Sequence, residues 1–466
     1  MRGDRRAGAA VQAAAGFAAR GPKREQESES MDKTMFFRIL NSEMELATGC
    51  TEPGAVALTG AYAGAELNKR GEVIRRMEVN ASTNILKNAM AAGIPGTKYT
   101  GMGYASAIGA CAAAPEKQLE VINGVSDDVY KAAELLVESG KVVVGHADVP
   151  QKLYIEVIAH GDTHTARAVI ADLHTNLIAL EVDGESVMTA TGGAAGGADK
   201  DVVTPEEIAD FLTLRKIYDF CDKELDPMND PIDIIRSAVS VNSAICEKGL
   251  EKEYGLAIGP GLRRNCRDGL MTWDMVTNSM MVASAGADAR MAGAPFSVVA
   301  NSGSGNQGIT ATMPTVALAR WKGISEDKML RAVTMSNLVA IRIKSKFGRL
   351  SALCGATVAG TGSACAITYL LGGDYDAVCR AVPNMIGNVA GMLCDGAKAD
   401  CALKISSCVN AAFQAAFMAL RGVRVQNTDG IVETDPEHTI DNFAELGNKG
   451  SGPLDAAILH MMLNKK

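Results

Sequence analysis

The fold class is decided by residues 152–185, which read KLYIEVIAHGDTHTARAVIADLHTNLIALEVDGE. β-Branched and aliphatic residues alternate here with polar ones, and turn residues separate the runs, which is typical of strands with one buried face. The segment KVVVGHADV, residues 141–149, has the same character and predicts one more strand. We therefore expect a small antiparallel sheet that packs against helices.

Beyond this stretch the patterns are mostly helical. Thr204 is followed three residues later by Glu207, which is the signature of a capping box at a helix start. Residues 327–344, DKMLRAVTMSNLVAIRIK, have the spacing of an amphipathic helix. The predicted fold class is α+β, with a mainly helical catalytic core and a small antiparallel β-sheet subdomain.

The changes in composition along the chain predict four segments. Residues 1–30 are rich in Arg and Ala and then polar, which suggests an upstream start, a disordered or non-native extension, or a targeting peptide. Residues 31–140 would form the N-terminal part of the core and 141–200 the β-rich subdomain. Residues 201–466 would complete the helical core.

Composition and charge narrow the possible functions. The 466 residues include 48 glycines but only 5% aromatic residues, so we expect a core of small and aliphatic side chains with closely approaching helices. The net charge of −8 and the lack of a broad basic segment argue against nucleic acid as a partner and favour a small substrate.

The number of cysteines indicates the cellular compartment of the protein. The eleven cysteines are an odd number in a long chain, which argues against a disulfide framework and favours reduced thiols in a cytoplasmic protein.

The stretch Ser351–Gly373 carries no charge over a length that could span a bilayer. Its many Gly, Ser and Thr residues predict a buried helix pair or helical hairpin instead, so we expect no membrane partner.

Three thiols in the helical half are candidate metal ligands: Cys354, Cys394 and Cys401. Zinc sites usually use tighter cysteine pairs or add histidines, and no histidine lies near these cysteines in sequence. Three soft thiolates suit an iron–sulfur cluster, in which a missing fourth ligand would leave one iron open to substrate. Ordinary buried thiols explain the same pattern.

Cys50 is a candidate of another kind. It precedes Thr51, where we expect a helix to begin. The partial positive charge and free N–H groups of a helix N-terminus favour thiolate over thiol, so Cys50 could act as a general base or nucleophile. A small apolar residue in a turn is the alternative interpretation.

A glycine-rich segment, ANSGSGNQGITATMP at residues 300–314, formally matches the dinucleotide-binding pattern G-x-G-x-x-G. Pro314 falls early in the following helix, and no acidic residue ends a second strand at the expected distance, so we discount that fold. The loop could still offer N–H and amide donors to a small anion such as an amino-acid carboxylate, through Asn301, Ser302, Gly303, Ser304, Gly305, Asn306 and Gln307. A purely structural tight loop remains the alternative.

A second polar group could also bind a carboxylate. Asn84, Lys87 and Asn88 share one face if residues 81–97 are helical, because they lie three and four positions apart. A solvated helix face would produce the same spacing.

Four motifs together resemble one family. GCTEP at 49–53, NSGSGNQGITATMP at 301–314, RLSALCGA at 349–356 and MLCDGAKADCALK at 392–404 occur in the order typical of the L-cysteine desulfidase family. That family is related to the alpha domain of iron–sulfur L-serine dehydratases. The resemblance runs from about Met31 to the C-terminus.

The resemblance implies a cofactor and a base. It assigns Cys354, Cys394 and Cys401 as ligands of a 4Fe–4S cluster with one open iron, and Cys50 as the catalytic base. The implied enzyme is a lyase that needs no pyridoxal phosphate and converts L-cysteine into sulfide, ammonia and pyruvate by β-elimination.

Two alternatives to L-cysteine desulfidase stay open. L-serine could be the substrate, although the position of the small sheet inside the chain, and not in a separate preceding module, favours cysteine. An iron–sulfur sensor without catalysis is the third hypothesis, against which the acidic balance speaks. A homodimer is expected from the frequency of two-fold symmetry among soluble enzymes.

Overall fold

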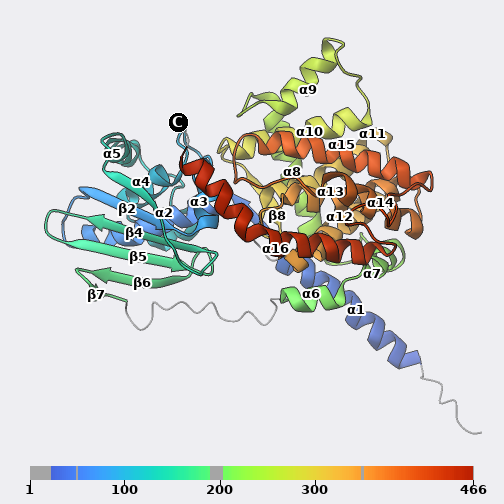
Figure 1. Cartoon of the computed structure of the whole chain (residues 1–466), viewed down its shortest axis with the longest axis horizontal. Coiled ribbons are helices and arrows are strands. Elements are labelled where there is room, and N and C mark those ends of the chain that lie inside the picture. The colour runs from blue at the N-terminus through green and yellow to red at the C-terminus, as the bar shows by residue number, and fades with distance from the viewer. Residues whose placement is uncertain (1–21, 49–50, 189–202, 348–350, 465–466) are drawn as a thin grey trace, which may run out of the picture.

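The computed structural model describes residues 22–48, 51–188, 203–347 and 351–464. Figure 1 shows two lobes, a smaller one built around a sheet and a larger helical one, with α16 (Pro436–Leu463) running from the helical lobe to the sheet lobe. Along this path α16 contacts α12 (Glu326–Phe347) and α14 (Tyr375–Val389) in one lobe and α3 (Thr83–Ala89) in the other. The α+β class is confirmed.

The sheet of the smaller lobe has six strands. Their spatial order is β3 (Val142–His146), β2 (Arg76–Ala81), β4 (Tyr154–His160), β5 (Thr165–Ala171), β6 (Leu177–Val182) and β7 (Glu185–Ser186). In β4, buried residues alternate with partly exposed ones, as the sequence pattern predicts.

One strand pair differs from the antiparallel expectation. β2 pairs in parallel with β3, whereas the other pairs are antiparallel. A parallel pair needs a long crossover, and here it contains α3, α4 (Met102–Ala112), the 3-10 turn η1 (Pro115–Glu120) and α5 (Asp127–Glu138). Because β2 lies before residue 141, the sheet extends beyond the predicted β-rich segment, and the proposed domain limits stay a prediction.

Helices α2 (Thr51–Asn68) and α4 pack closely because glycine backbones meet at their interface. A Cβ atom on Gly60 would lie 2.3 Å from the carbonyl oxygen of Ser106, and one on Gly64 would lie 2.1 Å from that of Ala110. A Cβ on Gly109 would lie 1.9 Å from the Ala57 oxygen. Any side chain at these positions would therefore separate the helices, which explains part of the high glycine content.

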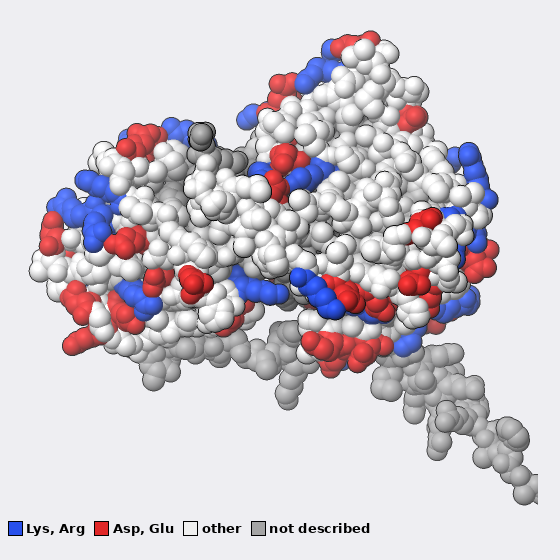
Figure 2. Space-filling view, in the orientation of Figure 1, with Lys and Arg blue, Asp and Glu red and all other residues white. Residues whose placement is uncertain are grey.

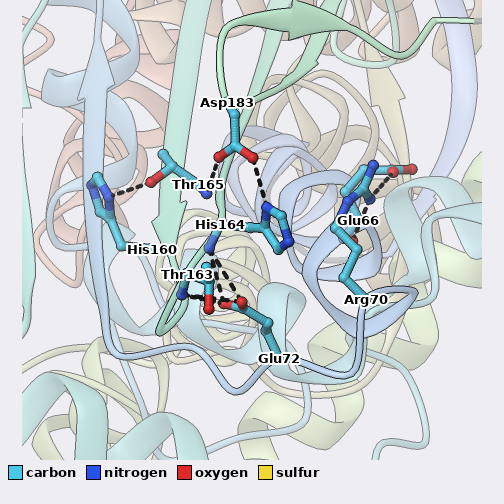
Figure 3. A network of polar contacts seen from close by, with 8 residues as sticks. All are labelled: Glu66, Arg70, Glu72, His160, Thr163, His164, Thr165 and Asp183. Carbon is cyan, nitrogen blue, oxygen red and sulfur yellow. Dashed lines mark hydrogen bonds and ion pairs between the residues drawn. The ribbon is translucent and has the colours of Figure 1, made fainter.

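A polar network ties the sheet turns to the segment after α2, as Figure 3 shows. The Glu72 carboxylate accepts hydrogen bonds from the backbone N–H groups of Thr163 and His164 at 3.0 and 3.2 Å. Asp183 accepts from His164 Nδ1 at 2.6 Å and from the N–H of Thr165 at 2.9 Å. These hydrogen bonds lower the pKa of both carboxyl groups, so the turns are held by ionised side chains at neutral pH.

The larger lobe contains most of the helices. They are α1 (Pro22–Glu43), α6 (Pro205–Phe211), α7 (Leu214–Asp219), the π-helical turn η2 (Phe220–Glu224), α8 (Asp233–Glu251), α9 (Ile258–Arg267), α10 (Met275–Met291), α11 (Gly305–Lys322), α12, α13 (Gly355–Leu370), α14 and α15 (Cys401–Leu420). The predicted capping box at Thr204 and Glu207 is present at the start of α6. A two-stranded antiparallel ribbon joins β1 (Met44–Thr48) to β8 (Ser297–Asn301).

The uncharged stretch Ser351–Gly373 contains one helix, α13, and not the expected helix pair or hairpin; the residues of α13 from Ala356 to Leu370 are all buried. Within the described ranges, one helix, α15, is long and apolar enough to cross a membrane, and 56% of its most apolar window is buried inside the lobe. On the face that Figure 2 shows, acidic and basic residues are interspersed. The expectations about nucleic acid and membrane partners stay predictions.

Candidate active site

A cavity of about 140 Å³ lies between the two lobes. The sheet lobe contributes Glu52 from α2 and Asn84, Lys87 and Asn88 from α3. The helical lobe contributes the three candidate thiols, part of the glycine-rich loop, and two cationic side chains. Residues that are far apart in sequence and that we singled out independently therefore line one space.

Local backbone pairing holds two of the thiols. Cys354 directly precedes α13, and its N–H donates to the carbonyl oxygen of Met392 at 2.9 Å. The N–H of Cys394 donates to the carbonyl oxygen of Ala352 at 2.7 Å, which completes an antiparallel bridge between the two segments. Cys401 is the first residue of α15, and its Sγ lies 3.6 Å from the Gly396 carbonyl oxygen.

The thiols influence one another, which reflects their proximity. Burial raises the pKa of Cys354 well above its usual value, and the nearby Cys394 and Cys401 raise it further. Burial likewise raises the pKa of Cys401 to about 11. Cys354 and Cys401 stand at the N-termini of α13 and α15, where helix dipoles favour negative charge on a bound group. A bound cation would reverse the effect of burial and deprotonate these thiols.

A charge cluster shapes the loop between Cys394 and Cys401. The Asp395 carboxylate accepts from Lys398 Nζ at 2.6 Å and also pairs with Lys404. Burial alone would raise the pKa of Asp395, but the two lysines outweigh it and hold the pKa at about 2. The loop is thus fixed by a permanently ionised side chain.

Gly396 brings the same loop against the sheet lobe. Its φ of 101° lies in the region that favours glycine, and a Cβ there would be 1.9 Å from the Lys87 carbonyl oxygen. The loop that carries two thiols therefore packs directly on the backbone of α3.

The sulfur donors around the cavity suit some metal groups better than others. Among the residues described, no three or more His, Cys, Asp or Glu side chains are grouped so as to hold a single metal ion. In an iron–sulfur cluster the thiolates are carried by different iron atoms, so its ligands need not converge on one point. Three sulfur donors around one cavity fit such a group better than they fit zinc.

The glycine-rich loop is partly exposed to the cavity. Ser302, Gly303 and Ser304 line it, and Ser302 and Gly303 have φ values of 47° and 79°. Asn301 lies behind this wall, fully buried, and does not line the cavity. Gly305 does not line it either, and a Cβ on Gly305 would come within 2.4 Å of Arg290 Nε. Direct substrate contact by Asn301 and Gly305 gains no support from this arrangement.

Two of the α3 side chains that line the cavity, Lys87 and Asn88, already have partners within the protein. Lys87 is 2% exposed, and its Nζ lies 2.5 Å from the Asp455 carboxylate of α16. Asn88 Nδ2 donates to Glu52 Oε1 at 3.2 Å. The carboxylate that Lys87 contacts is thus an internal one, and its predicted role in substrate binding stays a prediction.

Three charged lining residues were missing from the candidates derived from sequence: Glu52, Lys344 and Arg290. Glu52 belongs to the GCTEP motif, which was a signal for it, whereas Lys344 ends an amphipathic helix pattern and carried none. Burial lowers the pKa of Lys344 to about 8, although the nearby Cys394 and Cys354 act in the opposite direction. Arg290 Nη1 donates to Asn306 Oδ1 at 3.3 Å.

Cys50 lies outside the described residues. Its neighbour Thr51 begins α2, and Glu52 lines the cavity, so the motif approaches the site through the start of this helix. The role of Cys50 as a base stays a prediction.

Comparison with known proteins agrees with this arrangement. Residues 116–460 match the family model described as serine dehydratase alpha chain, and the chain belongs to that family. It is 42% identical over 431 residues to a UPF0597 protein of Oleidesulfovibrio alaskensis, covering 92% of this chain and 98% of the relative.

Two further relatives carry the same name. A UPF0597 protein of Shewanella pealeana is 42% identical over 435 residues, and one of Phocaeicola vulgatus is 40% identical over 440 residues. The matches cover 92% and 93% of this chain, and 98% of each relative. Family membership points to a lyase similar to serine dehydratase.

Proposed function

We propose that this protein is an iron–sulfur-dependent lyase of the L-cysteine desulfidase type, which converts L-cysteine into pyruvate, ammonia and sulfide without pyridoxal phosphate. The observation that carries the proposal is the convergence of Cys354, Cys394 and Cys401 on one cavity with the glycine-rich loop. A cavity of about 140 Å³ suits a small amino acid.

Three residues would hold the cofactor. Cys354, Cys394 and Cys401 would be the ligands of a 4Fe–4S cluster with one open iron, which would supply Lewis acidity to the leaving group of the substrate when bound. The protein supplies the remaining parts: a loop held by the ion pairs of Asp395, a cavity of substrate size, and polar groups that orient the substrate.

The elimination needs a base on the protein. In the proposed reaction the Cys50 thiolate takes the proton from Cα, the electron pair of that bond forms the Cα–Cβ double bond, and the Cβ–S bond breaks to release sulfide. The aminoacrylate product tautomerises to an imine, and one water molecule hydrolyses it to pyruvate and ammonia.

L-serine is the second candidate substrate, because the matching family is named for serine dehydratase. The same base and the same cavity would then eliminate water instead of sulfide. We keep cysteine as the first candidate because the four motifs resemble the desulfidase family. We also propose a cytoplasmic homodimer.

One experiment separates the two substrates. The protein is purified without oxygen and reconstituted with iron and sulfide, and pyruvate and newly released sulfide are measured with each amino acid. Sulfide and pyruvate from L-cysteine support the first proposal, and pyruvate from L-serine alone supports the second. A loaded protein that forms neither product would contradict both.

A single substitution tests the base. Cys50→Ser should reduce turnover by at least about 100-fold while iron and labile sulfide per chain stay at the wild-type level, because a serine hydroxyl is a far weaker base than a thiolate. Cys266→Ser, in α9 of the helical lobe, is the matched control and should keep full activity. Near-normal turnover of Cys50→Ser would show that another group removes the proton.

A further inference from the structure

A buried amide oxygen in the wall of the cavity has no hydrogen-bond partner among the described residues. Gln307 is 1% exposed and lines the cavity, and its Oε1 accepts no hydrogen bond from any residue that the structure describes. A buried acceptor left unsatisfied is destabilising, so a ligand donor that reached this oxygen would stabilise the protein.

The identity of this atom as oxygen follows from a chain of three amides. Asn337 Nδ2 donates to the backbone oxygen of Val333 at 2.9 Å, and a carbonyl oxygen can only accept. Asn337 Oδ1 must then accept, and it does so from Asn301 Nδ2 at 3.0 Å. Asn301 Oδ1 in turn accepts from Gln307 Nε2 at 2.8 Å. Each amide orients the next, and the last one, Gln307 in the cavity wall, is left with an oxygen that accepts no hydrogen bond from the described residues.

This relay gives buried Asn301 a role other than the expected contact with substrate. The side chain is a link between Asn337 in α12 and Gln307 in α11, with Ser302 Oγ donating to the same Asn301 oxygen at 3.1 Å. Rotating the Gln307 side-chain amide by half a turn would place its Oε1 against Asn301 Oδ1, and two acceptors would then face each other. Gln307 thus offers the cavity an acceptor, and not the anion-binding donor that a glycine-rich loop suggests.

A second acceptor lines the same cavity from the opposite lobe. Asn84 Oδ1 is buried and has no hydrogen-bond partner within the described ranges. Glu52, also a lining residue, adds a carboxylate that accepts from Asn88 and Thr51. Together these groups favour a ligand with a positively charged donor.

A cation lines the cavity as well. Lys344 is partly buried, and the structure records no hydrogen bond or ion pair for its ammonium with any described residue. Lys87, the other lining lysine, is neutralised by Asp455. Lys344 therefore remains available to pair with an anionic group of a ligand, a pairing that is strengthened where water is excluded.

We propose that the cavity recognises an α-amino acid as a zwitterion, with the ammonium donating to Gln307 Oε1 and Asn84 Oδ1 and the carboxylate pairing with Lys344. This inference rests on the proposed function for the choice of site, and it concerns the charged ends of the substrate, which any leaving group would share. Acids without an amino group and amines without a carboxylate should both bind poorly.

Non-reacting probes test the ammonium contact independently of catalysis. L-alanine carries both charges but no leaving group, and propionate lacks only the ammonium. Calorimetric titration of wild-type protein should show a clear preference for L-alanine, both as purified and after reconstitution. Gln307→Met should reduce that preference about 10- to 100-fold, the value of a hydrogen bond to a charged group.

Two controls accompany this variant. Gln414→Met, at an exposed position on α15, should leave the preference unchanged. If Gln307→Met fails to fold by circular dichroism, Gly355→Ala replaces it, since the added Cβ would lie 3.0 Å from Gln307 Oε1 and obstruct the acceptor. An unchanged preference in the folded variant would overturn the ammonium assignment.

Ethylamine, which lacks the carboxylate, tests Lys344. Lys344→Met should lower the preference for L-alanine over ethylamine about 10- to 100-fold, whereas Lys322→Met on the exposed part of α11 should not. Loss of iron from Lys344→Met with an unchanged preference would mean that the ammonium serves the thiolates, which would overturn the carboxylate assignment. Absence of turnover with cysteine and serine in a protein that still discriminates these probes would refute the proposed function alone.

Discussion

The two walls of the cavity differ in how far their polar side chains are already paired within the protein. On the α3 wall, Lys87 is paired with Asp455 and Asn88 with Glu52, so these groups have little left to offer a ligand. On the helical wall, Gln307 Oε1 has no hydrogen-bond partner among the described residues, and Cys354 and Cys394 are held by backbone pairing that does not use their sulfurs. The α3 wall mainly joins the lobes, although Asn84 Oδ1 on it also lacks a partner among the described residues, and the helical wall carries the thiols.

This contrast matters because buried charges rarely stay unpaired without a reason. A paired charge stabilises the arrangement of the two lobes, whereas an unpaired polar group costs stability and is retained where function needs it. The largest effects on activity should therefore come from the helical wall, and the largest effects on stability from the α3 wall.

Removal of one thiol should produce the largest effect. Cys394→Ser replaces a soft ligand by a hard hydroxyl, so iron content and turnover should fall together, with turnover lower by at least about 100-fold. Iron and labile sulfide per chain, measured beside pyruvate formation, check this prediction. A variant that retains both would remove Cys394 from the ligand set.

Breaking the ion pair of the α3 wall should mainly reduce stability. Lys87→Met leaves the Asp455 carboxylate buried without its cation, which should lower the free energy of unfolding by about 3–5 kcal/mol. Denaturant unfolding measures the loss. The double variant Lys87→Met/Asp455→Leu should recover most of it, because no isolated charge remains, and failure to recover would argue that the pair does more than neutralise itself.

A buried carboxylate outside the cavity extends the comparison. Asp288 is fully buried, its Oδ2 accepts from the N–H of Gly259 at 2.9 Å, and burial raises its pKa to about 6. The folded state then holds a proton that the unfolded state has already released above about pH 4, so this group destabilises the fold progressively between about pH 4 and 6.

Asp288→Asn should remove that pH dependence. The amide oxygen can still accept from Gly259 without carrying a charge, so the variant should gain about 1–3 kcal/mol over wild type at pH 7.5 and little at pH 4. Chemical denaturation at both values measures the difference. An equal gain at the two values would show that the substitution acts through packing.

The smallest effect is expected for a neutral partner on the α3 wall. Asn88→Ala removes the hydrogen bond to Glu52 and should cost about 0.5–1.5 kcal/mol of stability while iron content stays unchanged. Thermal unfolding and iron analysis test both parts. A loss of iron would mean that the two walls are less separate than their contacts indicate.

The sequence by itself determined the fold class, the buried helix α13 and the capping box at Thr204. These depend on local periodicity and on side chains that act within a few residues, which is why they can be read from one chain. It also supplied the candidate thiols and the glycine-rich loop, because soft sulfur donors and glycine-rich polar segments can be recognised by residue type, although structural roles explained the same patterns.

Only the tertiary structure decided which polar groups are available in the cavity. Lys87 and its partner Asp455 are 368 residues apart, so no local pattern can reveal that one lysine is neutralised. The parallel pairing of β2 with β3 and the amide relay that aims Gln307 likewise depend on contacts between distant segments. Residue type sets what a side chain can do, but its partners, brought close by folding, determine what remains free for a ligand.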